Sequence, residues 1–255
     1  MFRLDGKVVL ISGASRGLGW GMAKSLAQQG ATVCLNGRDR ETLITRSNEL
    51  KEQGYQAEVV PFDVSDTDER ERAIDALLKK LGKIDVLIAN AGIQHRSTIE
   101  SFSDSDFRRV IDTNLGGVWA LAKSVAPGMK SRQSGRIIFT GSITANMGRP
   151  TISAYIASKG GVHALARQLA VELGGAGITV NVIAPGYFAT EVNEALISDK
   201  EFSVSDVNKT FTKTAVFGER IGLPFGEIIV IPILDNSIPF SDFIGSTISV
   251  SYRPI

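Results

Sequence analysis

Residues 7–19, KVVLISGASRGLG, decide the fold class of this 255-residue chain. An apolar run at 7–12 is followed by glycines at positions 13, 17 and 19, and a helical pattern begins at 17. Glycine tolerates positive φ and lets a ligand approach the backbone, and a helix N-terminus offers unpaired N–H groups to a phosphate. The stretch therefore predicts a strand–turn–helix unit suited to a pyrophosphate, with a tight turn that binds no ligand as the alternative.

Strand and helix patterns alternate along the chain to about residue 185. The apolar runs are continuous rather than alternating in polarity, which is typical of strands covered on both faces. We expect strands at 7–12, 32–36, 57–62, 84–89, 136–142 and 178–184, and helices at 17–29, 41–53, 66–81, 103–130 and 152–173. The alternation predicts an α/β fold, a three-layer doubly wound parallel sheet of the Rossmann-like type, in a single domain spanning residues 1–255.

Glycine and aspartate mark several expected helix ends. Gly30, Gly54 and Gly82 each follow a helical pattern, where a C-terminal cap favours glycine. Asp66 and Asp104 stand where N-caps are expected.

The pattern weakens after about residue 202. Thr247–Val250 is a candidate last strand. Residues 225–240 lie where the topology calls for a further covering helix, although Pro232 and Pro239 disfavour one locally.

The overall composition excludes several kinds of protein. Lys and Arg total 28 against 27 Asp and Glu, and a net charge of +1 gives no electrostatic signature of a nucleic-acid-binding protein. The single cysteine, Cys34, cannot form an internal disulfide, and with two histidines in the chain a structural zinc site is not expected. No apolar run approaches the roughly 20 residues of a membrane span, and the start does not read as a signal peptide. We expect a cytoplasmic protein without metal, nucleic-acid or membrane partners.

The end of the second expected strand indicates which dinucleotide the glycine turn would hold. An acidic residue there accepts from a ribose 2′-hydroxyl, whereas an arginine accommodates a 2′-phosphate. The segment 35–38 reads LNGR, without an acid before Asp39, and Arg16 stands in the glycine turn beside Arg38 as a second candidate. Because the arginine fork suits a phosphate, the sequence favours NADP(H) over NAD(H).

Two further strand ends carry candidate cofactor contacts. Asp63 ends the third expected strand and is placed to accept from an adenine amino group, unless it is only a turn or N-cap aspartate. Asn90, Ala91 and Gly92 end the fourth, where small residues either let the backbone pass close to a cofactor or simply pack.

A possible proton-transfer group follows the fifth expected strand. Tyr155 and Lys159 are four residues apart at a helix start and so lie on one face. Tyrosine has a pKa of about 10, and a neighbouring ammonium favours the phenolate, so we expect Lys159 to lower the pKa of Tyr155. Ser142 ends the strand and could hold a carbonyl oxygen, while Asn114, inside an expected helix, suggests a polar structural role. Each residue alone is more often ordinary packing or solvation.

In this order and at these spacings, the motifs resemble the short-chain dehydrogenase/reductase family. The match runs from about Leu4 to Glu191. The resemblance implies hydride transfer between a nicotinamide and a carbonyl or secondary-alcohol carbon. It also implies a homotetramer formed by the outer faces of 103–130 and 152–173, and a substrate lid at about 187–225. The segment 202–243 departs from the family pattern, apart from 220–224, and Val250 is not followed by the usual Asp-Gly-Gly.

The resemblance also implies roles for individual residues. Tyr155 would be the general acid/base, Lys159 would bond the nicotinamide ribose, and Ser142 would orient the substrate oxygen. Asn114 would hold a water that links Lys159 to solvent. The expected cofactor-binding residues are Gly13, Ser15, Arg16, Gly17, Leu18, Gly19, Arg38, Asp63, Val64, Asn90, Ala91, Gly92, Tyr155, Lys159, Pro185 and Gly186.

Residues 35–38, 91–96, 149–150 and 184–191 resemble the gluconate 5-dehydrogenase (5-ketogluconate reductase) branch of the family. Arg96 and Arg149 join Ser142 and Tyr155 as candidate substrate contacts, because an arginine can pair with a sugar-acid carboxylate, although surface charge is an equal alternative. We expect an NADP(H)-dependent oxidoreductase acting on a keto-sugar acid or polyol such as 5-ketogluconate or gluconate. A 3-oxoacyl-carrier-protein reductase is the alternative within the family, and a non-catalytic NADP(H)-binding regulatory protein is the alternative of another class.

Overall fold

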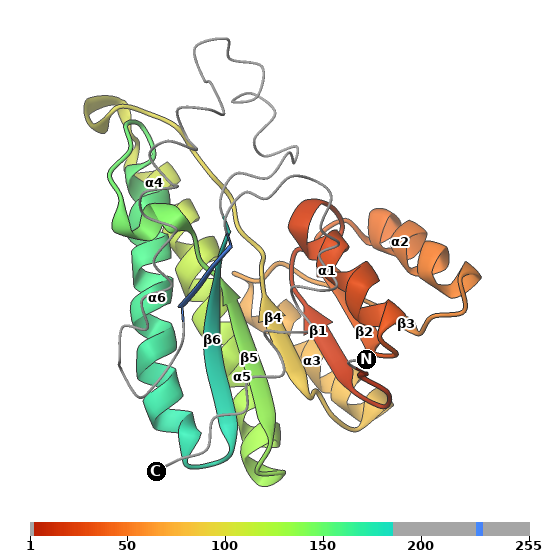
Figure 1. The fold of residues 1–255 in the computed structure, drawn as a ribbon. Coiled ribbons are helices and arrows are strands. Elements are labelled where there is room, and N and C mark those ends of the chain that lie inside the picture. Colours follow the sequence, from red (N-terminus) through yellow and green to blue (C-terminus); the bar gives the residue numbers. More distant parts are fainter. Residues whose placement is uncertain (1–2, 186–227, 232–255) are drawn as a thin grey trace.

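The computed structural model describes residues 3–185 and 228–231, which form one seven-stranded parallel sheet with helices on both faces (Figure 1). The spatial order is β3-β2-β1-β4-β5-β6-β7. The strands are β1 (Val8–Ile11), β2 (Thr32–Gly37), β3 (Ala57–Pro61), β4 (Val86–Ala89), β5 (Gly135–Thr140), β6 (Ile178–Pro185) and β7 (Ile228–Ile231). The expected Rossmann-like fold is confirmed.

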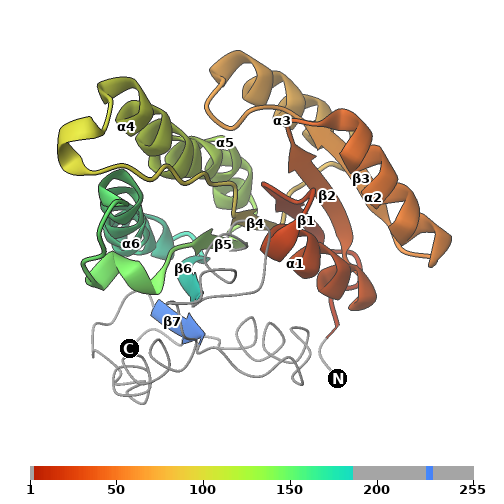
Figure 2. The same cartoon turned by 90° about the horizontal axis from the view of Figure 1, so that it is seen from above.

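The helices of the described residues make two layers around this sheet. Helices α3, α5 and α6 share one apolar core with the sheet, and α1 and α2 share the other, so that α3 and α1 lie on opposite sides in Figure 2. The helices are α1 (Gly17–Gln28), α2 (Arg40–Glu52), α3 (Thr67–Leu81), α4 (Asp104–Ile111), α5 (Gly117–Ser131) and α6 (Ser153–Gly174). Within the described residues, every helix is too short or too polar to span a lipid bilayer.

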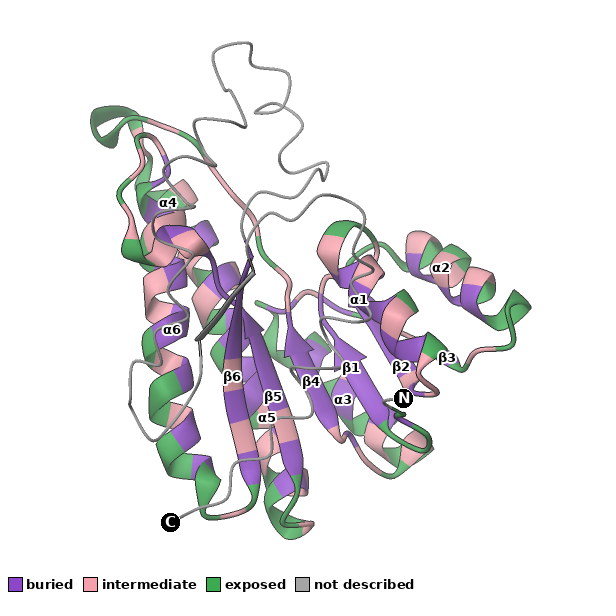
Figure 3. Ribbon diagram, in the orientation of Figure 1, coloured by how far each residue is buried: buried purple, intermediate pink, exposed green. Residues whose placement is uncertain are grey.

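The central strands contribute side chains to both cores. In β1, Val8 and Leu10 pack toward α3, α5 and α6, whereas Val9 and Ile11 pack toward α1 and α2. Figure 3 shows this burial along the strands. Burial on both faces is the physical reason for the continuous apolar runs in the sequence.

Most of the expected helix ends are confirmed. Gly30, Gly54 and Gly82 have φ of 94°, 83° and 76°, a left-handed conformation that glycine adopts without strain. Asp66 caps α3 by accepting from the Glu69 N–H at 2.9 Å. The expectation for Asp104 was wrong.

The residue before Asp104 is the N-cap of α4. The Ser103 hydroxyl accepts from the Asp106 N–H at 3.0 Å, and Asp104 is the first helical residue. Both serine and aspartate are good caps, so the local sequence does not distinguish them.

The helix expected over 103–130 is divided. Helix α4 ends at Ile111, a π-helical turn occupies Asp112–Gly116, and α5 follows. Asn114 lies in this turn, where it is fully buried. A π-turn places an extra residue in one helical turn and is frequent at functional sites. The apolar period of the sequence does not reveal the interruption, because both flanking segments are ordinary helices.

The described C-terminal segment is a strand. Ile228–Ile231 forms β7, with Ile228 opposite Val182 of β6, so the helix suggested by topology is absent at these four positions. Branched side chains and the following Pro232 favour the extended conformation. The candidate strand Thr247–Val250 and the expected lid at 187–225 lie outside the described residues.

The strand order brings two predicted motifs together. From β1 the chain proceeds outward to β3 and then returns to the other side of β1 as β4. The loops after β1 and β4 therefore diverge, and open α/β sheets bind ligands in the crevice at such a point. The glycine turn follows β1 and Asn90 follows β4, so both stand at this crevice.

Phe139 of β5 offers a direct test of the core, because it is the largest completely buried side chain among the described residues. We expect Phe139→Ala to lower the free energy of unfolding by about 3–5 kcal/mol through lost burial and the cavity left behind. Urea unfolding followed by circular dichroism measures this. Ile99→Ala is the control, since Ile99 is 79% exposed and its loss should change the free energy by no more than about 0.5 kcal/mol. Similar effects of the two substitutions would contradict the described core.

Candidate active site

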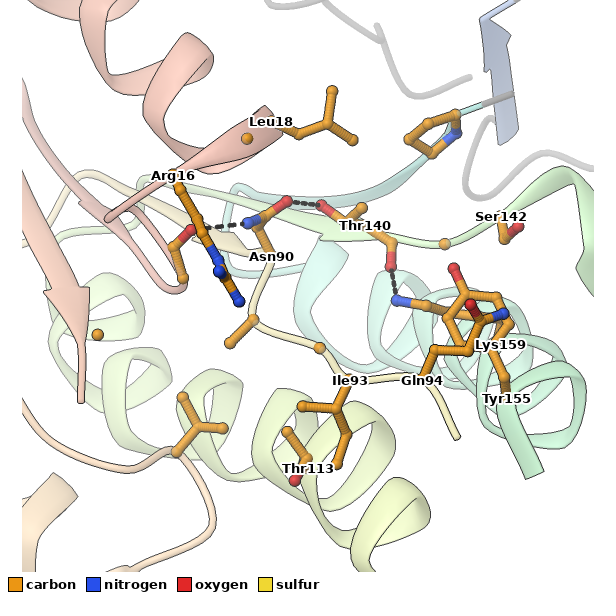
Figure 4. A pocket seen from close by; sticks show the side chains of 18 of the residues that line it. Arg16, Leu18, Asn90, Ile93, Gln94, Thr113, Thr140, Ser142, Tyr155 and Lys159 are labelled. Carbon is orange, nitrogen blue, oxygen red and sulfur yellow. Dashed lines mark hydrogen bonds between the residues drawn. The ribbon is translucent and has the colours of Figure 1, made fainter. Parts of the chain in front are cut away.

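A pocket opens along the carboxyl edge of the sheet, around the ends of strands β1 to β6 (Figure 4). It gathers most of the residues predicted to bind cofactor or substrate or to transfer a proton. Those in its lining are Gly13, Ser15, Arg16, Gly17, Leu18, Arg38, Asp63, Val64, Asn90, Ala91, Gly92, Arg96, Ser142, Arg149, Tyr155, Lys159 and Pro185. Gly19 and Asn114 do not line it, and Gly186 lies outside the described residues.

The glycine turn presents an uncapped helix start to this pocket. The N-cap residue of α1, Arg16, makes no side-chain cap hydrogen bond, and the first turn holds no acidic residue. The first N–H groups of a helix lack partners within it and carry partial positive charge, so this helix start suits a phosphate. Gly19 has a packing role, since a Cβ there would overlap the Gly13 carbonyl oxygen.

A run of hydrogen bonds joins the ends of β1, β4 and β5. The Ser12 hydroxyl accepts from the Asn90 N–H at 2.9 Å, and Asn90 Nδ2 donates to the Gly13 carbonyl at 3.2 Å. Asn90 Oδ1 accepts from Thr140 Oγ1 at 3.2 Å, and the Thr140 carbonyl accepts from Lys159 Nζ at 2.6 Å, as Figure 4 shows. The run therefore connects the glycine turn to Lys159.

Lys159 is buried, with 3% of its surface exposed. Burial disfavours the charged form and lowers its pKa to about 8. Its Nζ lies 5.6 Å from the centre of the Tyr155 ring. Lys159 is thus an amine near its titration point, one helical turn from a phenol.

The pKa of Tyr155 is raised, which is opposite to the expected direction. Desolvation of the phenol raises it, and a hydrogen bond with Ser142 only partly offsets this. The expected lowering by Lys159 is not seen because burial is the larger effect and the ammonium donates to Thr140 instead. The phenol is therefore protonated at neutral pH in this arrangement.

Ser142 is fixed from two sides. Its Oγ lies 2.8 Å from Thr144 Oγ1 and accepts from the Thr144 N–H at 3.2 Å. The Ser142 side chain also acts on Tyr155, since it lowers the pKa of that phenol. Ser142 and Tyr155, from different elements, line the same pocket.

Asn114 joins the loop after β4 to α6. Its Oδ1 accepts from the Ile93 N–H at 2.8 Å, and its Nδ2 donates to the Ile93 carbonyl at 2.9 Å and to Ser158 Oγ at 3.2 Å. Ser158 Oγ in turn donates to the Tyr155 carbonyl at 2.7 Å. The side chain thereby holds two parts of the site together.

Arg38 and Asp63 face each other at the β2–β3 end of the pocket. Arg38 Nη1 lies 3.8 Å from Asp63 Oδ2, and Asp63 Oδ1 accepts from the Ser65 N–H at 2.9 Å and hydroxyl at 2.6 Å. Partial burial alone would raise the pKa of Asp63, but the Ser65 hydrogen bonds and the Arg38 charge outweigh it and lower the pKa. The turn contact that was the alternative for Asp63 is present, and it leaves the carboxylate at the pocket.

The two candidate substrate arginines stand close together. Partial burial lowers the pKa of Arg149, and repulsion from the Arg96 charge lowers it further. A backbone hydrogen bond from the Ser97 N–H to the Thr151 carbonyl, 2.9 Å long, ties the two loops that carry them. Thr151 has a φ of 69°, a costly conformation for a β-branched residue. Both arginines line the pocket that also contains Ser142 and Tyr155.

Sequence reasoning missed Ser12, Thr140 and His163. Ser12 and Thr140 are each the polar residue that ends an otherwise apolar strand run, and this signal could have found them. His163 follows Lys159 by one helical turn on α6 and gave no such signal.

His163 packs directly beneath the loop that carries Ser142. It is 4% exposed, and its Nε2 accepts a long hydrogen bond of 3.5 Å from the Ser142 N–H. A Cβ at Gly141 would overlap this Nε2, so glycine is required for the approach. Burial, followed by the Arg167 and Lys159 charges, lowers the pKa of His163 to about 4, which keeps the ring neutral.

A model of the short chain dehydrogenase family matches residues 7–201. The chain belongs to the short-chain dehydrogenase family. It is 40% identical over 203 residues to the gluconate 5-dehydrogenase of Gluconobacter oxydans (strain 621H). The aligned residues cover 80% of this chain and 79% of that protein. It is 34% identical over 197 residues to a 3-oxoacyl-(acyl-carrier-protein) reductase of Vibrio harveyi, covering 77% of this chain and 80% of that protein.

A solved structure gives the same family and fold. The crystal structure of a gluconate 5-dehydrogenase from Burkholderia cenocepacia J2315 in complex with NADP and tartrate has a TM-score of 0.77 and 39% identity, covering 79% of each chain. These matches confirm the expected family and the expected enzyme class, an oxidoreductase. They also confirm the predicted resemblance to the gluconate 5-dehydrogenase branch of the family. The roles of the individual site residues stay predictions.

The buried His163 should make the free energy of unfolding of this protein depend on pH. Its folded pKa of about 4 lies below the unfolded value of 6.5, so stability is lost as the pH falls from about 6.5 toward 4. We expect the free energy of unfolding to drop by up to about 2 kcal/mol more between pH 7 and pH 5 in the wild type than in His163→Gln, which does not titrate. Urea unfolding at the two pH values measures this. An equal drop in both proteins would contradict the lowered pKa of His163 in the folded protein.

Proposed function

We propose that this enzyme is NADP(H)-dependent and acts on a keto-sugar acid or polyol such as 5-ketogluconate or gluconate. The observation that carries the proposal is the meeting of Ser142, Tyr155 and Lys159 in the same pocket as an uncapped glycine turn. One part of the pocket suits a dinucleotide phosphate and the other suits proton transfer to an oxygen.

The residues present fit a 2′-phosphorylated dinucleotide. The start of α1 offers uncapped N–H groups, and Arg16 and Arg38 line the pocket next to Gly37, where a carboxylate would stand in an NAD(H)-selective site. The NADP in the Burkholderia cenocepacia structure supports this choice. When bound, the nicotinamide supplies or accepts the hydride.

In the proposed reduction, the chain itself holds the substrate oxygen and delivers a proton. The Ser142 hydroxyl donates to the carbonyl oxygen, and Tyr155 transfers its phenolic proton to that oxygen as the neighbouring carbon receives the hydride. The raised pKa of Tyr155 suits this direction because the phenol is protonated beforehand. Lys159, with a pKa of about 8, stabilises the resulting phenolate and can share its proton. We keep the predicted water held by Asn114 as the route back to solvent.

The two arginines support a sugar-acid substrate. Arg96 and Arg149 line the same pocket, and the Arg96 charge contributes to the lowered pKa of Arg149, so two guanidinium groups are available there to bind an anion. A carboxylate accepts charge-assisted hydrogen bonds from a guanidinium, which contribute about 1.5–3 kcal/mol each. The Burkholderia cenocepacia protein was crystallised with tartrate, a hydroxy acid, which agrees with this class of ligand.

Other expectations enter as parts of the same proposal. A 3-oxoacyl-carrier-protein reductase remains the second candidate, because a protein of that name matches 77% of the chain. The non-catalytic regulator is not proposed, since the family match identifies an enzyme.

We propose one domain with a lid at 187–225 and a cytoplasmic location. We also propose a homotetramer built on α4, α5 and α6, where Phe107, Trp119 and Val171 are exposed.

Absorbance at 340 nm with NADPH and a panel of carbonyl compounds tests the reaction. We expect oxidation of NADPH with 5-ketogluconate, little with acyl thioesters, and a lower Michaelis constant for NADPH than for NADH.

Tyr155→Phe should lower kcat by roughly 10²–10⁴-fold, because the proton donor is lost. The same variant should bind NADPH with wild-type affinity. Activity confined to acyl thioesters would favour the carrier-protein reductase, and an active Tyr155→Phe enzyme would contradict the assigned acid.

Arg149→Gln tests the carboxylate contact. We expect kcat/KM for 5-ketogluconate to fall by roughly 10–100-fold, and kcat/KM for a neutral six-carbon ketose to change by less than about threefold. Arg108→Gln, at an exposed position on α4, is the control for loss of one positive charge. Equal losses on the charged and the neutral substrate would show that Arg149 does not recognise a carboxylate.

A further inference from the structure

Arg46, in the middle of α2, contacts the glycine turn from outside the pocket. Its Nε donates to the Ser15 carbonyl oxygen at 3.1 Å, and its Nη1 lies 2.8 Å from Glu49 Oε1. Its guanidinium carbon lies 5.0 Å from the centre of the buried Trp20 ring of α1. With its side chain 31% exposed, one partly buried cation thus connects α1, α2 and the turn.

The Ser15 contact sets the direction of one peptide group. In a trans peptide the carbonyl oxygen and the following N–H point to opposite sides, so holding the Ser15 oxygen also directs the Arg16 N–H. The next residue, Gly17, has a φ of 56° and gives the turn little torsional resistance. A rotated peptide would present an oxygen atom to the 2′-phosphate of the proposed dinucleotide, and the bond from Arg46 opposes that rotation.

This peptide lies at the end of the pocket that is suited to the 2′-phosphate. A Cβ on Gly37 would be 3.7 Å from Ser15 Oγ, so Ser15 packs against the end of β2. Arg38 follows Gly37 directly, and Arg16 extends from the peptide that Arg46 holds. Both arginines line the pocket.

We propose that Arg46 is a positioning residue that makes this site selective for a 2′-phosphorylated dinucleotide. It acts through Ser15, by fixing the peptide from which Arg16 reaches the phosphate. The inference rests on the proposed NADP(H) dependence. A dinucleotide with a free 2′-hydroxyl presents no charge at this end, so its affinity depends far less on Arg46.

Lys24 offers a matched control. Its Nζ lies 5.6 Å from the centre of the same Trp20 ring. Lys24 belongs to α1, whereas the hydrogen bond to the Ser15 carbonyl comes from Arg46 of α2. Lys24→Met and Arg46→Met each remove one positive charge from this ring. The two variants therefore differ in the bond to the turn, while the general electrostatic change is similar.

The test measures the binding of NADPH and of NADH to the full-length protein by calorimetry, without turnover. We expect Arg46→Met to raise the Kd of NADPH by about tenfold and that of NADH by less than twofold. Lys24→Met should leave both within twofold. Arg46→Lys, which keeps a donor and the charge but loses the planar fork, should raise the Kd of NADPH by an intermediate amount of about threefold.

The outcomes separate this inference from the cofactor assignment. A wild type that binds NADH more tightly than NADPH overturns the proposed cofactor, and the inference with it. A wild type that prefers NADPH, together with equal weakening of both nucleotides in Arg46→Met, overturns the inference alone. The inference is also overturned if Arg46→Met changes the two Kd values no more than Lys24→Met does. Should Arg46→Met unfold, Arg46→Lys decides in the same way, because an unchanged ratio of the two Kd values contradicts a role in selectivity.

Discussion

The buried ammonium of Lys159 is the constraint around which the site is arranged. A cation with 3% exposure needs a close acceptor, and it has one in the Thr140 carbonyl at 2.6 Å. Thr140 is held by Asn90, and Asn90 by Ser12 and the glycine turn. Satisfying one charge therefore links the part of the pocket that suits a phosphate to the part that suits proton transfer. The same burial leaves the amine with a pKa of about 8, close to neutral pH, where it can either donate or retain a proton.

The sheet supplies the frame in which such a chain of polar contacts can form. Its central strands β1 and β4 are apolar along their length, because helices cover both faces, and the polar residues Ser12 and Asn90 follow directly where these strands end. Since the strands are parallel, all of these ends lie at one edge, and the reversal of order between β1 and β4 opens a crevice there. Residues that are 12, 90 and 140 positions along the chain therefore become hydrogen-bonded neighbours without any local sequence relation among them.

Much of this could be predicted from the sequence, and the failures have physical causes. Apart from the interruption of the helix expected over 103–130, the strands and helices up to residue 185 were predictable because period and glycine position are local signals. Tyr155 and Lys159 were placed together by helical spacing alone. The direction of the Tyr155 pKa was not predictable, since it depends on burial of the phenol and on which acceptor Lys159 selects. The N-cap at Ser103 instead of Asp104 reflects two adjacent residues with similar capping ability. His163 and Arg46 act through contacts with residues 21 and 31 positions away, which no local pattern encodes.

The π-helical turn at Asp112–Gly116 resolves a conflict of helical phase. Asn114 must point toward the loop at Ile93, while Val118 and Leu121, shortly after it, must point into the sheet core. Each residue of an α-helix rotates the next by about 100°, so a regular helix fixes the angle between these two directions. The additional residue in the turn changes that angle. A chain shortened by one residue at this place would have to give up either the anchor of the active-site loop or part of the core.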